Sequence, residues 1–207
     1  MRRTREDIRE QLLESALVEF GAKGFDGAST RSIAQRVNAH QPQINYHFAS
    51  KEALWFAAVD HLFELLGAEL ADLPLLARVD DPQELASVFA EAIRRFVRFA
   101  AAHPQLNRIM VHEGTEDTDR LRWMVDRHVR PLYDAIRVVW ERLRDAGIAA
   151  PIDSATVHYV IVGAASLPFV NAPEARLLTG VEPTDAAWVD AHADGLVATL
   201  LPGLLDR

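Results

Sequence analysis

The stretch NYHFASKEAL, from Asn45 to Leu54, places groups suited to anion binding at the start of an expected helix. Ser50 is a favourable N-cap residue, so Lys51 falls in the first helical turn. A cation in this turn opposes the positive end of the helix dipole, where Asp or Glu would add stability. The arrangement becomes favourable when an external anion binds, and phosphate is the commonest such anion. We therefore expect Lys51 to bind a phosphate group.

The residues before this stretch predict helices joined by tight turns. Thr4–Ala22 has apolar residues at every fourth position, which is typical of an amphipathic helix. The glycines of GAKGFDGAS end that helix, and Phe25 within this segment is expected to reach the core. Ser29 or Thr30 then caps a second, short helix that continues to Val37.

A third helix follows over QPQINYHF, with Pro42 in its first turn, where proline is tolerated. Asn38 precedes it and accepts the left-handed backbone of a tight turn. Two short helices joined in this way predict a helix-turn-helix, whose second helix lies in a major groove of DNA. Only Ile44 and Phe48 of this helix are expected to face inward. The other side chains form a polar surface: Gln41, Gln43, Asn45 and His47.

This polar surface suits contacts with base edges. Gln and Asn amides can pair bidentately with adenine, and the ring of Pro42 can meet a thymine methyl group. The alternative is an ordinary solvated helix face. For Tyr46 the alternative is packing against the first helix, and for His47 it is an exposed helix end. Thr30 and Lys51, at the starts of the flanking helices, are expected to bind phosphates on either side of the groove.

The net charge of −8 argues against nucleic acid until its distribution is considered. Residues 1–52 carry eight basic and seven acidic residues, a net charge of +1, so the remaining residues carry −9. Most acids of this segment lie in the first helix, between Glu6 and Glu19. One basic face can therefore form from the remaining basic positions: Arg2, Arg3, Arg5, Arg31, Arg36 and Lys51.

The segment STRSIAQRVNAHQPQINYHFASKEAL, Ser29 to Leu54, resembles the TetR family of ligand-responsive bacterial transcription regulators. The resemblance rests on the capped helix, the turn, the Tyr-His-Phe triplet and the Ser-Lys-Glu start of the next helix. Asn38 departs from the glycine that is usual in the family. The resemblance implies phosphate contacts for Thr30, Tyr46, His47 and Lys51. It implies base contacts for Arg31, Gln41, Pro42, Gln43 and Asn45.

The rest of the chain also predicts helices, so the fold class is all-α. The expected helices are residues 51–70, a stripe from Leu85 to Ala100, a short helix in QLNRIMVHEG, a kinked helix from Leu121 to Leu143 across Pro131, and residues 154–169 and 184–205. We expect a helix-turn-helix DNA-binding domain at residues 1–50 and a helical effector-binding and dimerisation domain at residues 51–207.

By the family resemblance, the second domain encloses a cavity for a small, largely apolar effector that releases the DNA. Candidate contacts are aromatic or polar residues of the middle helices: Phe89, Phe96, Asn107, Met110, Trp123, His128, Tyr133, His158 and Tyr159. Aromatic residues at helical spacing are also typical of an ordinary core, and Trp140 belongs to the same group. The small residues of the 154–169 helix, together with the 184–205 helix, predict a homodimer that reads a near-palindromic operator.

The sequence lacks the residues that several other functions require. The chain has no cysteine, and its eight histidines show no paired metal-ligand spacing, so we expect no metal and no cofactor. Its longest apolar run, VIVGAASLPFV, is shorter than a membrane span, and a cytoplasmic location is expected. An all-helical enzyme or carrier is the alternative, but no catalytic motif supports it. The sequence leaves the effector, the operator and the direction of the ligand's effect open.

Overall fold

A computed structural model describes residues 5–73 and 79–205, and every regular element within these ranges is a helix. The all-α fold class is thus confirmed. Arg2, Arg3 and the expected helix start at Thr4 lie outside the described residues. The chain forms two compact units, Met1–Leu65 with Gln105–Met124, and Leu66–Pro104 with Val125–Arg207. The domain boundary predicted between residues 50 and 51 follows the end of the helix-turn-helix pattern. The first boundary between the compact units instead lies inside a helix, between Leu65 and Leu66.

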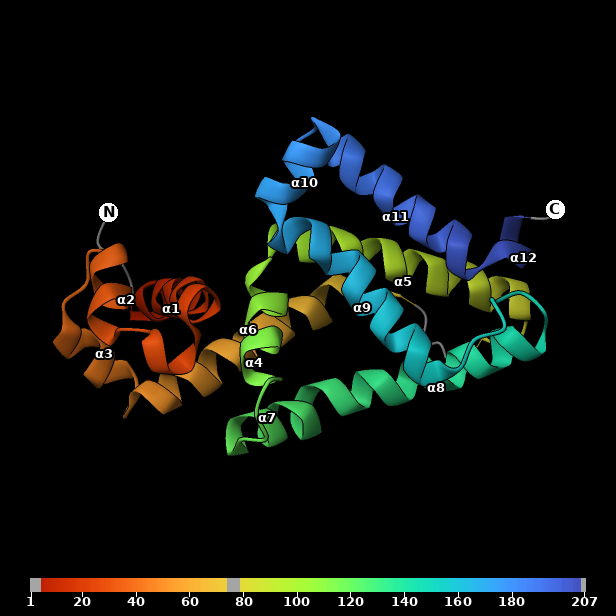
Figure 1. The fold of residues 1–207 in the computed structure, drawn as a ribbon. Helices are drawn as coiled ribbons and strands as arrows, with labels where there is room; N and C mark the ends of the chain where they lie inside the picture. Colours follow the sequence, from red (N-terminus) through yellow and green to blue (C-terminus); the bar gives the residue numbers. More distant parts are fainter. Residues whose placement is uncertain (1–4, 74–78, 206–207) are drawn as a thin grey trace. The chain divides into compact units, whose positions relative to one another are not determined.

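The first unit contains α1 (Arg5–Gly27), α2 (Thr30–Arg36), α3 (Gln41–His47), most of α4 (Lys51–Leu70), α6 (Gln105–Glu113) and α7 (Asp119–Met124). Helix α1 packs against α2 and α6 (Figure 1). Its fully buried side chains include Leu12, Leu13 and Phe20, which confirms the amphipathic stripe. Helical hydrogen bonding continues beyond the expected end, but the backbone kinks at Gly24, where φ is 67° and ψ is 177°.

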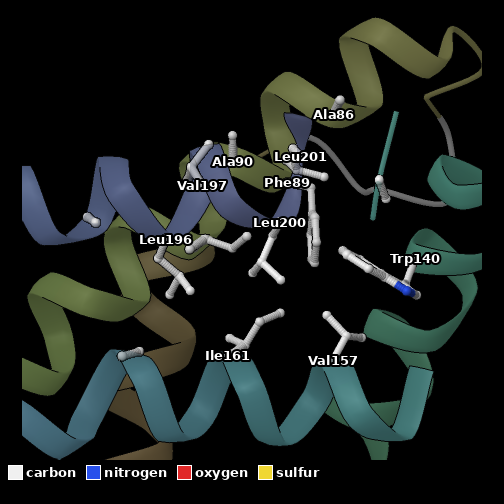
Figure 2. Close-up of a cluster of buried hydrophobic side chains, with 14 of the residues drawn as sticks. Ala86, Phe89, Ala90, Trp140, Val157, Ile161, Leu196, Val197, Leu200 and Leu201 are labelled. Carbon is white, nitrogen blue, oxygen red and sulfur yellow. The ribbon is translucent and has the colours of Figure 1, made fainter. Parts of the chain in front are cut away.

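The second unit contains α5 (Pro82–Ala102), α8 (Arg130–Asp145), α9 (Ser154–Val170), α10 (Ala172–Thr179), α11 (Ala186–Leu200) and α12 (Pro202–Leu205). Helix α5 packs against α8, α9 and α11. Figure 2 shows Phe89, Trp140, Val157 and Leu200 converging from these helices. The indole N–H of Trp140 donates to the carbonyl oxygen of Ile152 at 2.9 Å, which satisfies the polar atom of this buried ring.

The predicted kink at Pro131 takes the form of a π-helical turn. Helical structure continues from α7 through the π turn Val125–Val129 into α8, so the chain forms one interrupted helix as expected. Pro131 lacks an amide proton and its ring crowds the preceding turn, which a widened turn accommodates. The wider turn therefore ends at Val129, two residues before the proline.

Two details of the last helices differ from the sequence prediction. Helix α10 was not predicted, because none of its residues is buried and it has no apolar stripe facing a core. The expected 184–205 helix is divided into α11 and α12, since Pro202 cannot continue α11. Within the described ranges no single helix is long and apolar enough to cross a membrane, although α9 and α10 pass that test as a pair bent by 81°.

Candidate nucleic-acid interface

The turn between α2 and α3 has the backbone that Asn38 predicts. Its φ of 55° is the only positive value at a non-glycine position among the described residues. The cap of α2 is Ser29, whose Oγ accepts the amide of Ser32 at 3.4 Å, so the choice between Ser29 and Thr30 is settled. The buried side chains of Ile33 and Ala34 hold α2 in the core.

Helix α3 is attached by its two expected apolar residues. Ile44 and Phe48 are 1% and 5% exposed. Gln41, Pro42 and Asn45 are exposed, and Tyr46 is 64% exposed rather than packed on α1. His47 is half-buried and contacts Tyr46 edge to face, with ring centroids 5.2 Å apart. The outer face of α3 is therefore polar and aromatic, with an exposed tyrosine that does not contribute to a core.

Gln43 differs from the free base-reading amide that the sequence suggested. Its Oε1 accepts the amide of His40 at 2.8 Å, which caps the start of α3. The capping bond satisfies one of the backbone donors that a helix start leaves unpaired. A bidentate contact with adenine would compete with this bond.

The starts of α2 and α3 lie together. The Nε2 of Gln41 donates to Oγ1 of Thr30 at 3.5 Å, so the first residues of the two helices are neighbours. Arg31, the next residue of α2, is exposed. This arrangement brings the expected phosphate contact of Thr30 beside the expected base contacts of α3.

The start of α4 also contacts the last turn of α1. Ser50 caps α4 as predicted, because its Oγ accepts the amide of Ala53 at 3.0 Å. The ammonium of Lys51 donates to the carbonyl oxygen of Asp26 at 3.2 Å and lies 4.8 Å from the ring centroid of Phe25. An ammonium has three protons, so this contact leaves donors for a phosphate.

A buried carboxylate joins α1 to α2. Glu19 is 1% exposed and pairs with Lys23 at 2.8 Å and Arg36 at 3.1 Å, and it accepts the amide of Ser29 at 3.3 Å. Burial alone raises the pKa of this carboxyl, but the hydrogen bonds from Lys23, Ser29 and Arg36 outweigh it and bring the pKa below its ordinary value. Arg36 therefore forms an ion pair with α1. The charge pattern had placed it among the residues of one basic face.

The candidate effector residues are divided between the two compact units. Asn107, Met110 and Trp123 belong to the first unit, where Trp123 contacts Trp55 and Phe56 at centroid distances of 5.9 and 4.5 Å. The others belong to the second unit: Phe89, Phe96, His128, Tyr133, His158 and Tyr159. Phe89 is 3% exposed and packs within the main core of this unit. Phe96 is partly buried against the same core, and Tyr159 is 76% exposed.

His158 and Tyr133 are the candidates with a suitable polar arrangement. Their rings meet edge to face with centroids 5.3 Å apart. Burial lowers the pKa of His158, which favours the neutral imidazole near pH 7. Its Nδ1 is buried without a hydrogen-bond partner in the described part of the chain. A ligand group that hydrogen-bonds to this atom would remove the cost of leaving it unsatisfied.

Comparison with known proteins decides the family. Residues 12–58 match the family described as bacterial regulatory proteins, tetR family, and residues 87–200 match the tetracyclin repressor-like C-terminal domain. The chain belongs to the TetR family. The protein is thus a helix-turn-helix transcriptional regulator, as the resemblance implied.

Relatives of this TetR-family protein match over most of its length. It is 24% identical to the transcriptional regulator RutR of Escherichia coli strain K12, over 96% of this chain and 91% of RutR. It is 24% identical to the transcriptional repressor NicS of Pseudomonas putida, over 91% of this chain and 86% of NicS. The crystal structure of AibR in complex with isovaleryl coenzyme A and operator DNA has the same fold, with a TM-score of 0.72 and 18% identity over 94% of this chain and 98% of AibR.

Two contacts of the TetR-type interface were missed from the sequence. Glu19 was counted only among the acids of the first helix, and its partner Arg36 lies 17 residues away. Arg120 was not considered, yet its guanidinium carbon lies 3.9 Å from the ring centroid of Phe25. One signal was available for Glu19, since it lies beside Phe20 between apolar residues of α1. The contact of Arg120 had no local signal, because its partners are distant in sequence.

Proposed function

We propose that this TetR-family protein is a homodimeric repressor that binds a near-palindromic operator through α3 and is released from it by a small-molecule effector. The observation that carries the proposal is the outer face of α3, which exposes polar and aromatic side chains beside the starts of α2 and α4. A protein of this kind acts in the cytoplasm, where the bacterial chromosome lies.

The side chains divide into phosphate and base contacts. Thr30, Tyr46, His47 and Lys51 bind phosphates, and the amide donors at the start of α4 add to the Lys51 contact. Gln41 and Asn45 read base edges, with Arg31 and Pro42 beside them. Gln43 contributes mainly by capping α3 through its bond to the His40 amide.

A DNA titration tests this assignment. The wild type and the Lys51→Ala variant are titrated against duplexes from the region beside the chain's own gene, at several salt concentrations, with fluorescence anisotropy as the readout. Losing one phosphate contact per subunit should lower the slope of log K against log salt by about 0.9 per subunit. Asn45→Ala should instead relax the base preference, by about 1–3 kcal/mol if a bidentate pair is lost.

Arg144→Ala is the control for this titration, because Arg144 pairs with the neighbouring Asp145 on α8 of the other unit. It should leave both the affinity and the salt slope unchanged. Equal salt slopes for the wild type and Lys51→Ala would show that the Lys51 ammonium does not bind phosphate. Absence of binding to every duplex would remove the proposed operator function.

The proposed dimer uses α9 and α11. Tyr159 and Leu167 of α9 are 76% and 57% exposed, and Gly163 has open space where a side chain would project. Gly195 of α11 has open space as well. Exposed apolar groups beside small residues suit close packing with a second copy. A two-fold dimer then presents two α3 helices to half-sites separated by about one turn of DNA or a multiple of it.

The proposed effector binds in the second unit, with His158 and Tyr133 as its polar contacts. Neutral His158 has a buried Nδ1 available for a hydrogen bond, and the apolar side chains of the same unit suit an apolar ligand. Because AibR was crystallised with isovaleryl coenzyme A, short acyl thioesters belong in the first screen. Thermal-shift screening should find a stabilising compound whose effect is lost in His158→Phe. A compound that stabilises both proteins equally does not use this histidine.

A further inference from the structure

A cluster of charged and aromatic side chains surrounds Phe25, which lies in the last turn of α1 after the kink at Gly24. The guanidinium carbon of Arg120 lies 3.9 Å from the Phe25 ring centroid, and the Nζ of Lys51 lies 4.8 Å from it. Phe20 stacks on the same ring with a centroid distance of 6.1 Å and an interplanar angle of 11°. All four residues belong to the first unit. Phe25 therefore joins α7 to the first residue of α4.

The position of the Phe25 ring is set by the backbone at Gly24 and by the side chain of Arg120. The kink at Gly24, with its φ of 67°, sets the direction of the last residues of α1 directly before Phe25. A side chain at residue 24 would be strained by this backbone and would lie 3.4 Å from Nδ1 of His112. Arg120 is held in turn, because its side chain lies between Phe25 and Trp55, whose ring centroid is 6.0 Å from the guanidinium carbon.

A buried carboxylate fixes Arg120 and offsets its charge. Glu113 is 5% exposed, and its Oε2 accepts from Nε of Arg120 at 3.1 Å and from Oγ1 of Thr118 at 3.4 Å. Two cations near one ring repel each other unless one of them is paired. Because Arg120 is paired with Glu113, Lys51 can share the Phe25 ring and keep its charge for an external anion.

We propose that Arg120 is a positioning residue for DNA binding, which holds Phe25 so that the Lys51 ammonium is set for its phosphate contact. The inference rests on the proposed function, since it assumes that Lys51 binds phosphate. The proposed role of Arg120 requires no contact with the DNA. It acts through the ring of Phe25, and the Asp26 carbonyl fixes the same ammonium by a hydrogen bond of 3.2 Å.

The first test follows the lysine directly. The sequence contains two lysines, Lys23 and Lys51, so reductive ¹³C-methylation gives two resolvable lysine signals by NMR while keeping both charges. The Lys51 signal should be shifted by the ring current of Phe25. Arg120→Gln should move it toward the Lys23 signal, and Phe25→Leu should remove the ring-current shift. An unchanged Lys51 signal in Arg120→Gln overturns the proposal.

The matched control is Arg122→Gln, two residues along the same helix. Arg122 is 62% exposed and pairs with Asp117 at 2.8 Å, away from the Phe25 ring. It should leave both lysine signals and the DNA affinity unchanged. Arg120→Gln leaves a buried carboxylate without its cation, so Phe25→Leu, which keeps the Glu113 pair, provides the second route to the same conclusion. A Lys51 signal that moves equally in Arg122→Gln would show a general disturbance of α7 and overturn the proposal.

The second test is a double-mutant cycle on DNA binding, using a duplex from beside the gene that the wild type binds. Phe25→Leu should weaken binding by roughly 2- to 5-fold at moderate salt, as expected for a lost cation–π contact, and should lower the salt slope. In the Lys51→Ala background the same change should have almost no further effect. Equal losses in both backgrounds mean that Phe25 acts independently of Lys51, which overturns the inference alone. Full binding by Lys51→Ala overturns the proposed phosphate contact and the inference with it.

Discussion

Asn38 links one residue type to one backbone conformation. Its φ of 55° lies in the left-handed region, which asparagine tolerates better than other non-glycine residues. Asn38→Gly should therefore leave the free energy of unfolding nearly unchanged, whereas Asn38→Ala should lower it by about 1 kcal/mol. Urea denaturation of the three proteins measures both changes. Equal stability of the alanine and glycine variants would show that this conformation costs nothing here.

Residues with local partners were predictable, and those with distant partners were not. Ser50 caps its own helix and Asn38 shapes its own turn, so neighbouring sequence was sufficient. The Gln43 amide has a backbone partner three residues away, yet the prediction that it reads base edges obscured that cap. Arg36 and Arg120 bind partners that only the tertiary fold brings near them.

At the scale of helices, the junction of α1 and α2 depends on the buried carboxylate of Glu19. Glu19→Gln removes its ion pairs with Lys23 and Arg36 and should lower the free energy of unfolding by about 1–3 kcal/mol. The folded-state pKa of Glu19 lies below its ordinary value of 4.5. Its stabilisation is therefore fully present above that value and is lost as the pH falls through the lowered pKa.

Thermal unfolding of the wild type and Glu19→Gln at several pH values checks this assignment. The difference between them should be constant near neutral pH and should shrink in acid. Arg36→Ala is a control that should lose only part of this stabilisation, because Glu19 keeps its 2.8 Å contact with Lys23. A difference that does not depend on pH would assign the loss to packing rather than to the charge.

The sequence predicted helices with a buried stripe more securely than helices without one. α4 and α5 follow their apolar patterns closely, and α4 has the expected bounds. In α10 the side chains of Leu177 and Leu178 are 87% and 78% exposed, so no buried face gave a periodic signal. The π turn before Pro131 also escaped prediction, because the proline indicates a distortion without specifying its form.

At the scale of the whole molecule, the proposed dimer gives a prediction that separates assembly from folding. Gly163→Glu places a side chain where nothing lies within 4 Å in the protomer. The protomer should fold normally, because an ordinary residue also favours a helix more than glycine does. The charged side chain should nevertheless disrupt an interface on α9, giving a monomer with weak operator binding.

Gly67→Glu is the matched control for assembly, because Gly67 lies on α4 and also has nothing within 4 Å of its missing side chain. Sedimentation at micromolar concentration should show dimers for the wild type and for this control, and monomers for Gly163→Glu. Dimers in all three proteins would place the interface away from α9. A wild-type monomer would remove the two-fold model of operator reading.

The two compact units are joined by the chain at three places, and two of them lie inside helical structure. One is within α4, between Leu65 and Leu66, and another is at the start of the π turn, between Met124 and Val125. A helix transmits a displacement along its axis better than a flexible loop does. Helix α4 therefore connects Lys51, the proposed phosphate contact, by a continuous helix to the unit proposed to bind the effector.

Release by an effector requires that it bind the DNA-incompetent state more tightly than the competent one, because equal affinity would shift nothing. The coupling is reciprocal, so operator DNA must weaken the effector by the same factor by which the effector weakens DNA binding. A compound from the thermal-shift screen is titrated by calorimetry with and without the bound duplex. We expect its Kd to rise in the presence of DNA by the factor measured in the converse DNA titration. An unchanged Kd would mean that the compound occupies a site unconnected to α3, whatever its effect on stability.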